Sequence, residues 1–154
     1  MKLHVAALVI SGSLLVVGPV QADEAKEQIE KLQGIWAAVT YIEDGQGEAK
    51  EIPASESPIR WAFKNDRVTF LADVETASAK GTYKLDPSKK PKTIDISFPP
   101  ASGEKLGQTL LGIYELDGDT LKTCYSPEGG QRPAEFQSKS GSKVILATFK
   151  RLKK

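Results

Sequence analysis

The chain of 154 residues carries 21 lysines and arginines against 20 aspartates and glutamates, with only one cysteine and one histidine. This balance of charge excludes a general nucleic-acid-binding role, because neutralising phosphates requires an excess of basic residues. A single cysteine also excludes an intramolecular disulfide, so the fold has to be held together by a hydrophobic core.

The first 22 residues have the pattern of an export signal. Lys2 precedes an apolar stretch over 5–17, and a Val-Gln-Ala sequence ending at Ala22 has small residues where signal peptidase requires them. The apolar stretch is shorter than the ~20 residues that a membrane-spanning helix needs. We therefore expect residues 1–22 to be cleaved and residues 23–154 to form one exported domain, periplasmic or extracellular, with no stable membrane insertion.

The only histidine of the chain, His4, lies inside this expected signal. Its removal would leave a domain without imidazole. That excludes Ser-His-Asp and Cys-His catalysis as well as zinc or haem held by histidine. No other set of residues indicates a reaction, so we expect no enzyme activity, no metal and no cofactor.

The segment 23–34 consists of helix-forming residues with acidic residues early and a glycine at its end. Ile29 and Leu32 lie three residues apart within it. This pattern predicts a short amphipathic helix that packs against the rest of the domain. After Gly34 the spacing of apolar residues changes to a period of two, which indicates β-strands.

Eight segments with this strand pattern follow one another, joined by turns or loops. Asn65-Asp66 suits a two-residue hairpin turn, and Asp117-Gly118-Asp119 suits another tight turn. The stretch 46–58 contains two prolines and is expected to be a loop. No long helix separates any pair of segments, which excludes parallel βαβ folds and favours an antiparallel meander, closed as a barrel or packed as a sandwich. The strands are expected at 35–43, 59–64, 67–72, 80–86, 92–98, 109–116, 120–126 and 143–151.

The first strand begins with Gly34-Ile35-Trp36, directly after the expected helix. This arrangement resembles lipocalins, in which a Gly-x-Trp closes the floor of the barrel and a basic residue of the last strand packs over the indole. The resemblance implies that Gly34, Trp36 and Arg151 close the barrel here, with Lys150 as the alternative to Arg151. A core tryptophan covered by an arginine side chain would be stabilising on physical grounds alone.

A longer resemblance lies in two blocks, 81–96 and 111–136, whose sequences begin GTYKLDPSKKP and LGIYELDGDTLKTCYSPEGG. They are similar to a family of exported or repeated domains, abundant in planctomycete bacteria, that is described as lipocalin-like and has no assigned activity. The similarity extends from Gly34 to about Lys150. It implies an all-β fold, an eight-stranded antiparallel up-and-down barrel with a short N-terminal helix, and carries over no catalytic residues.

Aromatic residues fall mostly on the expected inner faces of the strands. An eight-stranded barrel is near the size at which side chains either fill the interior or leave room for one small ligand. We expect non-catalytic binding of a small, largely apolar molecule, with a tyrosine or Arg132 at the rim as its polar contact. The alternative is a structural or protein-interaction module with a filled barrel. Small residues that would leave room inside are Ala62, Gly112 and Ala147. The residues expected to contact the ligand are Trp61, Phe63, Phe70, Tyr83, Tyr114, Tyr125 and Arg132.

Cys124 and Arg132 lie close together in the sequence and suggest chemistry of their own. Strand alternation puts Cys124 on the same face as Lys122, which could lower the thiol pKa, although a lone cysteine is more often a small buried apolar residue. Arg132 could clamp a carboxylate or phosphate. An arginine in such a turn more often pairs with a nearby carboxylate, here Glu128 or Glu135. We expect packing for Cys124, and favour the structural role for Arg132.

Overall fold

The computed structural model describes residues 19–48, 51–71, 77–100, 107–127 and 130–153. Most of the predicted signal lies outside these ranges, apart from residues 19–22, which begin the helix. In chain order the elements are α1 (Pro19–Leu32), β1 (Gly34–Glu43), β2 (Gln46–Glu48), the 3-10 turn η1 (Ala54–Glu56), β3 (Arg60–Lys64), β4 (Arg67–Leu71), β5 (Ala77–Asp86), β6 (Thr93–Ser97), β7 (Thr109–Asp117), β8 (Thr120–Ser126) and β9 (Ile145–Arg151).

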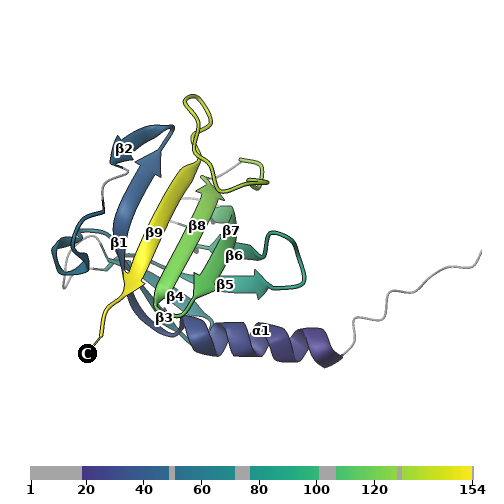
Figure 1. Cartoon of the computed structure of the whole chain (residues 1–154). Helices are drawn as coiled ribbons and strands as arrows, with labels where there is room; N and C mark the ends of the chain where they lie inside the picture. The colour runs from purple at the N-terminus through teal and green to yellow at the C-terminus, as the bar shows by residue number, and fades with distance from the viewer. Residues whose placement is uncertain (1–18, 49–50, 72–76, 101–106, 128–129, 154) are drawn as a thin grey trace, which may run out of the picture.

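Eight of the strands, β1 and β3 to β9, form a closed antiparallel barrel (Figure 1). Each barrel strand pairs with the next one along the chain, and β9 pairs back with β1 from Trp36↔Arg151 to Glu43↔Ile145. Every predicted strand corresponds to one of these eight. The predicted fold class, an up-and-down barrel with a short N-terminal helix, is confirmed.

The segment 46–58 is not the plain loop that was predicted, because it contains β2 and η1. β2 folds back on β1 as a hairpin whose turn residues, Asp44 and Gly45, have φ values of 52° and 72°. Positive φ at both central residues is the geometry of the tight hairpin turn that matches strand twist. The pairing of β1 with β3 ends at Ala37, so the later part of β1 has a free edge on that side, and β2 pairs with it there.

The inner faces of the strands form one continuous core, as period-two alternation requires. On β3, Trp61 and Phe63 point inward and are 2% and 3% exposed. Ala62 lies between them on the outer face, so the prediction that it points inward and could leave room for a ligand is wrong. Ala147 does belong to the core. The buried members of the core are Leu32, Trp36, Ala38, Trp61, Phe63, Val68, Tyr83, Ile94, Ile96, Tyr114, Leu121, Tyr125, Ile145, Ala147 and Phe149.

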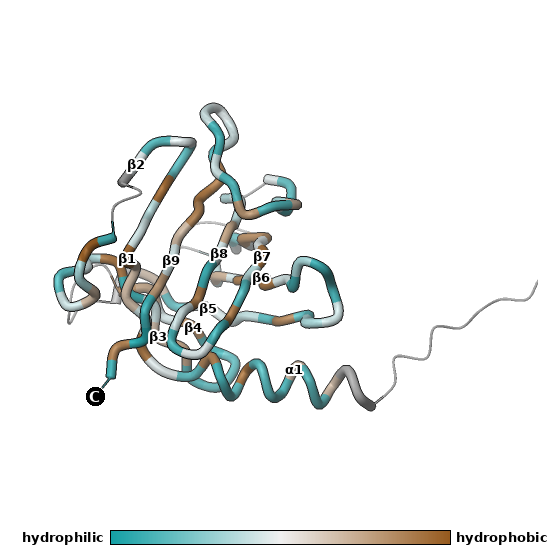
Figure 2. Tube along the Cα trace, viewed as in Figure 1, coloured by the Kyte–Doolittle hydropathy of each residue, from teal (hydrophilic) through white to brown (hydrophobic). Residues whose placement is uncertain are grey.

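Helix α1 lies across one end of the barrel (Figure 1). It is mostly hydrophilic along its length (Figure 2), and two apolar residues near its end meet the barrel: Leu32 is fully buried and Ile29 packs on the core. The Asn65-Asp66 turn is tied to the end of the helix, since the Asn65 amide donates to the side-chain oxygen of Gln33 over 2.6 Å. Within the described residues, no helix is long and apolar enough to cross a membrane.

Candidate functional site

The end of the barrel beside α1 is closed by Trp36, whose side chain is completely buried. Its indole nitrogen donates to the carbonyl oxygen of Leu32, the last helical residue, over 2.8 Å. The Arg151 guanidinium lies over the indole, 4.1 Å from the ring centre, close enough for a cation–π contact. Gly34, which starts β1 with φ of 120°, passes so near that an added Cβ would lie 3.2 Å from Arg151 Nη1.

Arg151 also satisfies the open end of the helix. Its two terminal nitrogens donate to the carbonyl oxygens of Lys31 and Gln33, groups that a helix C-terminus leaves without intrahelical partners. Nε donates to the Asp119 carboxylate over 3.0 Å. Lys150, the alternative to Arg151, instead donates to the Thr120 hydroxyl over 2.8 Å. The predicted packing of Arg151 over the Trp36 indole, next to Gly34, is therefore present.

The barrel interior is occupied by rings that pack on one another. Trp61 stacks on Phe70 with centroids 4.6 Å apart, and it also contacts the rings of Phe149 at 4.7 Å and Tyr125 at 5.6 Å. Phe63 joins this group through an edge contact with Trp61 at 6.0 Å, and it also meets the ring of Tyr83 edge to face at 5.0 Å. Five of the residues expected to contact a ligand are thus buried in the core of the described part of the barrel: Trp61, Phe63, Tyr83, Tyr114 and Tyr125.

The interior tyrosines are held in their neutral form. Burial is the largest cause that raises the pKa of Tyr114 and Tyr125 far above the ordinary value, and nearby carboxylates raise both further. Tyr83, whose pKa burial also raises, donates its hydroxyl to the Asn65 carbonyl over 2.6 Å. Phenols in this state act as structural hydrogen-bonding groups rather than as proton-transfer groups at neutral pH.

A hollow of about 480 Å³ lies at the opposite end of the barrel, the mouth. Phe70, near the end of β4, and Leu110, near the start of β7, line it together with Phe98 just beyond β6. The rings of Phe70 and Phe98 meet edge to face with centroids 5.0 Å apart. Gln108 and Lys80 add polar groups to the lining, which is completed by Ala79, Pro99 and Pro100.

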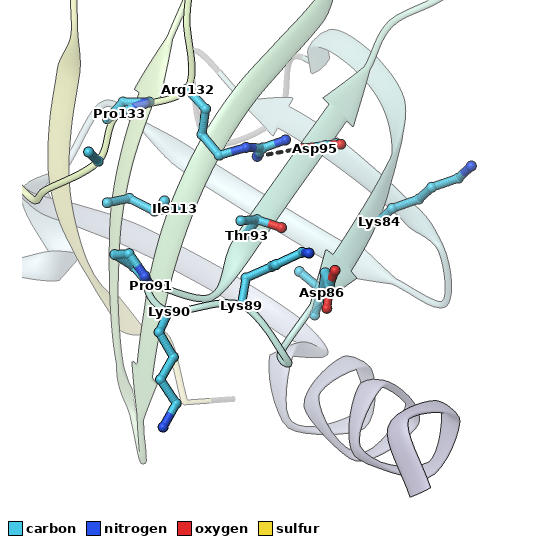
Figure 3. A pocket seen from close by; sticks show the side chains of 12 residues that line it. Lys84, Asp86, Lys89, Lys90, Pro91, Thr93, Asp95, Ile113, Arg132 and Pro133 are labelled. Carbon is cyan, nitrogen blue, oxygen red and sulfur yellow. Dashed lines mark ion pairs between the residues drawn. The ribbon is translucent and has the colours of Figure 1, made fainter. Parts of the chain in front are cut away.

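Arg132 does not reach this mouth. It lies across the outer wall of β6 and β7, where Nη1 is 2.6 Å from the Asp95 carboxylate and donates to the Gly112 carbonyl over 2.7 Å (Figure 3). The expected pairing with a carboxylate exists, but the partner is Asp95. Glu135 instead pairs with Lys139 at 3.2 Å, and Glu128 lies outside the described residues. Arg132 lines a second hollow of about 770 Å³ on this wall.

Cys124 is fully buried although it lies on the outer face of β8, the face that also carries Lys122. The segment between β8 and β9 covers it, and its Sγ is 3.7 Å from the Gln137 carbonyl oxygen. Burial raises the pKa of the Cys124 thiol, and Lys122 opposes this only in part. The Lys122 ammonium lies 5.0 Å over the ring of Phe136, a residue of the covering segment. Cys124 therefore packs, as expected, and is not an activated thiol.

Comparison with known proteins found no matching family model, no matching curated protein and no matching solved structure. Among the residues that the structure describes, no group of three or more histidine, cysteine, aspartate or glutamate side chains comes together to hold a metal ion. The arrangement that stands out is a barrel sealed at one end, filled in its middle, and hollowed at its mouth and on its outer wall.

Proposed function

We propose that this protein is an exported, non-catalytic binding protein, related to the planctomycete lipocalin-like family, that holds a small, largely apolar molecule. The observation that carries the proposal is the apolar hollow at the mouth of the barrel, above a packed aromatic floor. Its volume of about 480 Å³ lies within the range of about 300–1,000 Å³ that is usual for small-molecule sites.

The ligand would sit above the interior rings rather than among them. Phe70 and Leu110 would be its floor and Phe98 its wall, since these three side chains line the hollow and are only half-buried. Gln108 and Lys80 would supply the few polar contacts that orient an apolar ligand. Trp61 would contribute indirectly, because its ring stacks on Phe70 and holds it in place.

A second candidate function is supported by the same packed interior. If the mouth holds no ligand, the protein is a structural or protein-interaction module whose barrel serves as a rigid core. The filled middle of the barrel favours this alternative, and the two candidates differ in whether the mouth binds an apolar molecule.

Titration with an uncharged fluorescent lipophile, N-phenyl-1-naphthylamine, tests the proposal. Phe98→Ala should weaken its binding about tenfold, because losing a ring contact of about 1.4 kcal/mol changes a dissociation constant by that factor. Phe136→Ala is the matched control, since Phe136 is also half-buried but lies on the outer wall.

Native mass spectrometry and thermal unfolding against a panel of lipophiles complete the test. We expect a bound small molecule and a rise in Tm for the wild type and for Phe136→Ala. An unchanged Tm with every lipophile, together with no probe binding, would leave the interaction-module function in place of this one.

A further inference from the structure

The hollow on the outer wall, about 770 Å³, is larger than the hollow at the mouth of the barrel. β5, β6 and β7 form its base, the turn between β5 and β6 one side, and the segment 132–134 the other. In Figure 3, Arg132 and Lys89 approach the base from opposite sides, with Thr93 lying between them. Ile113, which is 1% exposed, lies beneath the base of the hollow.

Positive charge dominates the lining of this groove. The lining contains only two carboxylates, Asp86 and Asp95. It contains four cationic side chains: Lys84, Lys89, Lys90 and Arg132. None of the three ammonium groups has a hydrogen bond or an ion pair with any described residue. An anionic ligand could therefore use them without breaking an existing pair.

Both carboxylates of the groove are already engaged. Asp86 accepts hydrogen bonds from the hydroxyl of Ser88 over 2.5 Å and from its amide over 3.1 Å. These bonds, with smaller contributions from the charges of Lys89 and Arg132, hold the pKa of Asp86 below its ordinary value. Asp95 is paired with Arg132. Since the two carboxylates offset only two of the four positive charges, the groove retains an excess of positive charge for a ligand.

Arg132 is fixed in place while keeping donors to spare. Its Nη1 makes every hydrogen bond and ion pair that Arg132 forms with the described residues: to Asp95, to the Gly112 carbonyl and, more weakly at 3.4 Å, to the Ile94 carbonyl. Nε and Nη2 retain the remaining N–H groups of the guanidinium, which suit carboxylate and phosphate oxygens. A donor already held in position loses little conformational entropy when it binds.

We propose that this outer-wall groove binds a small, multiply charged oxyanion, of the phosphate or polycarboxylate type, between Arg132 and Lys89. The Thr93 hydroxyl lies between these two cations and would donate a third hydrogen bond. Lys84 and Lys90 extend from its edges and point away from this space in Figure 3, and their flexible side chains would turn toward a bound ligand. A single negative charge would leave the excess partly uncompensated, so the groove selects for ligands with at least two charges. This site is separate from the mouth of the barrel and does not depend on the function proposed there.

Isothermal titration of the full domain with pyrophosphate, citrate and acetate, at low ionic strength, tests this site. We expect one molecule of pyrophosphate or citrate to bind per chain, and acetate not to bind. Binding of pyrophosphate alone would identify a phosphate ligand, and binding of citrate alone a polycarboxylate. Added salt should weaken the interaction, because the lysines lie at the solvent-exposed edge.

The variant Lys89→Gln/Lys90→Gln should weaken binding about tenfold, equivalent to about 1.4 kcal/mol. Lys26→Gln/Lys64→Gln is the matched control: it also removes two positive charges, at exposed positions on α1 and β3 that do not line the groove. The control should bind as the wild type does. Equal weakening in both variants would mean general attraction to surface charge and would overturn the proposal.

Amide NMR shifts locate the bound anion and separate this site from the mouth. We expect pyrophosphate or citrate to move the resonances of Thr93, Ile113 and Ala134, and Phe98→Ala to leave those shifts unchanged. No heat with either polyanion, or shifts confined to other residues, would rule out the groove as an anion site. Neither result would bear on lipophile binding at the mouth.

Discussion

The two ends of this barrel are built in opposite ways. At the closed end Trp36 is fully buried, its N–H is bonded to the helix, and Arg151 covers it. At the mouth, Phe70, Phe98 and Leu110 are half-buried around a hollow. Local opening requires least free energy where apolar contacts are few, so the closed end should hold the fold together while the mouth can adapt to a ligand.

Strand β1 runs through both ends and shows where the change occurs. Its first residues, Gly34 to Ala37, pair with β3, and from Trp36 onward β1 also pairs with β9. An irregularity of register follows between Ala38 and Thr40, and beyond it β1 leaves β3 and pairs with β2 instead. Such a bulge bends a strand, and here it lies where β1 leaves β3 and turns to β2.

The largest effect is expected from Trp36→Ala at the closed end. Removing a fully buried tryptophan should lower the free energy of unfolding by about 3–5 kcal/mol, because the cavity cannot be filled by its rigid neighbours. Urea unfolding followed by circular dichroism measures this change. The same truncation at the mouth, Phe98→Ala, should cost only about 1 kcal/mol, since that side chain is only partly buried. Equal losses at the two positions would break the comparison.

Arg151→Ala should have the next largest effect, about 1–3 kcal/mol, because two helix carbonyls lose their donors and Trp36 loses its cover. Its ion pair with Asp119 adds little, since that carboxylate is half exposed. Arg151→Lys should recover only a small part of the loss, because an ammonium group cannot match the planar, forked guanidinium. Lys150→Ala is the neighbouring control and should be close to neutral. Full rescue by lysine would show that charge alone matters at this position.

Much of this contrast could be predicted from the sequence, because it rests on local patterns. Alternation predicted the inward positions of Trp61 and Phe63, and the resemblance to lipocalins implied the contact of Arg151 with Trp36 at the closed end. The first feature depends on the period of two along a strand. The second depends on the pairing of Trp36, near the start of β1, with Arg151, at the end of β9.

What the sequence did not reveal depends on contacts between distant residues. Arg132 pairs with Asp95, a residue of another strand, rather than with the nearby glutamates, because the covering segment crosses the outer wall of β6. The same crossing buries Cys124 on a face that alternation marks as outer. Whether rings fill a barrel depends on how their volumes fit together, which spacing along a chain does not encode.

Alkaline pH should weaken the fold through its interior tyrosines. An unfolded tyrosine loses its proton near pH 10, whereas burial raises the folded pKa of Tyr114 and Tyr125, so the folded state keeps its protons to higher pH. Their stabilising contribution is complete below pH 10. It then falls by up to about 1.4 kcal/mol per pH unit for each tyrosine as pH rises.

Urea unfolding between pH 8 and pH 11 measures this loss. Tyr114→Phe, beside the helix, and Tyr125→Phe, nearer the mouth, should each make the decline shallower than in the wild type. The difference between wild type and variant isolates the phenol from the lysines that titrate in the same range. If Tyr125→Phe alone left the slope unchanged, the mouth would already admit water to that hydroxyl.

The smallest effect is expected on the labelling of Cys124 by a thiol reagent, whose rate should not change when the closed end is weakened. The thiol is fully buried, and its pKa is raised, so labelling of the native protein should be slow. Its cover is the segment between β8 and β9, which is tied to β1 near the mouth by single hydrogen bonds, such as that from the Lys143 amide to Asp44 over 2.8 Å. Opening that cover should require less free energy than unfolding the barrel.

Arg151→Ala, which weakens the closed end, should therefore leave the rate at which Cys124 is labelled at the wild-type value. A rate that rises in proportion to the loss of global stability would mean that the cover opens only when the whole barrel does, and that the mouth is as firmly held as the floor.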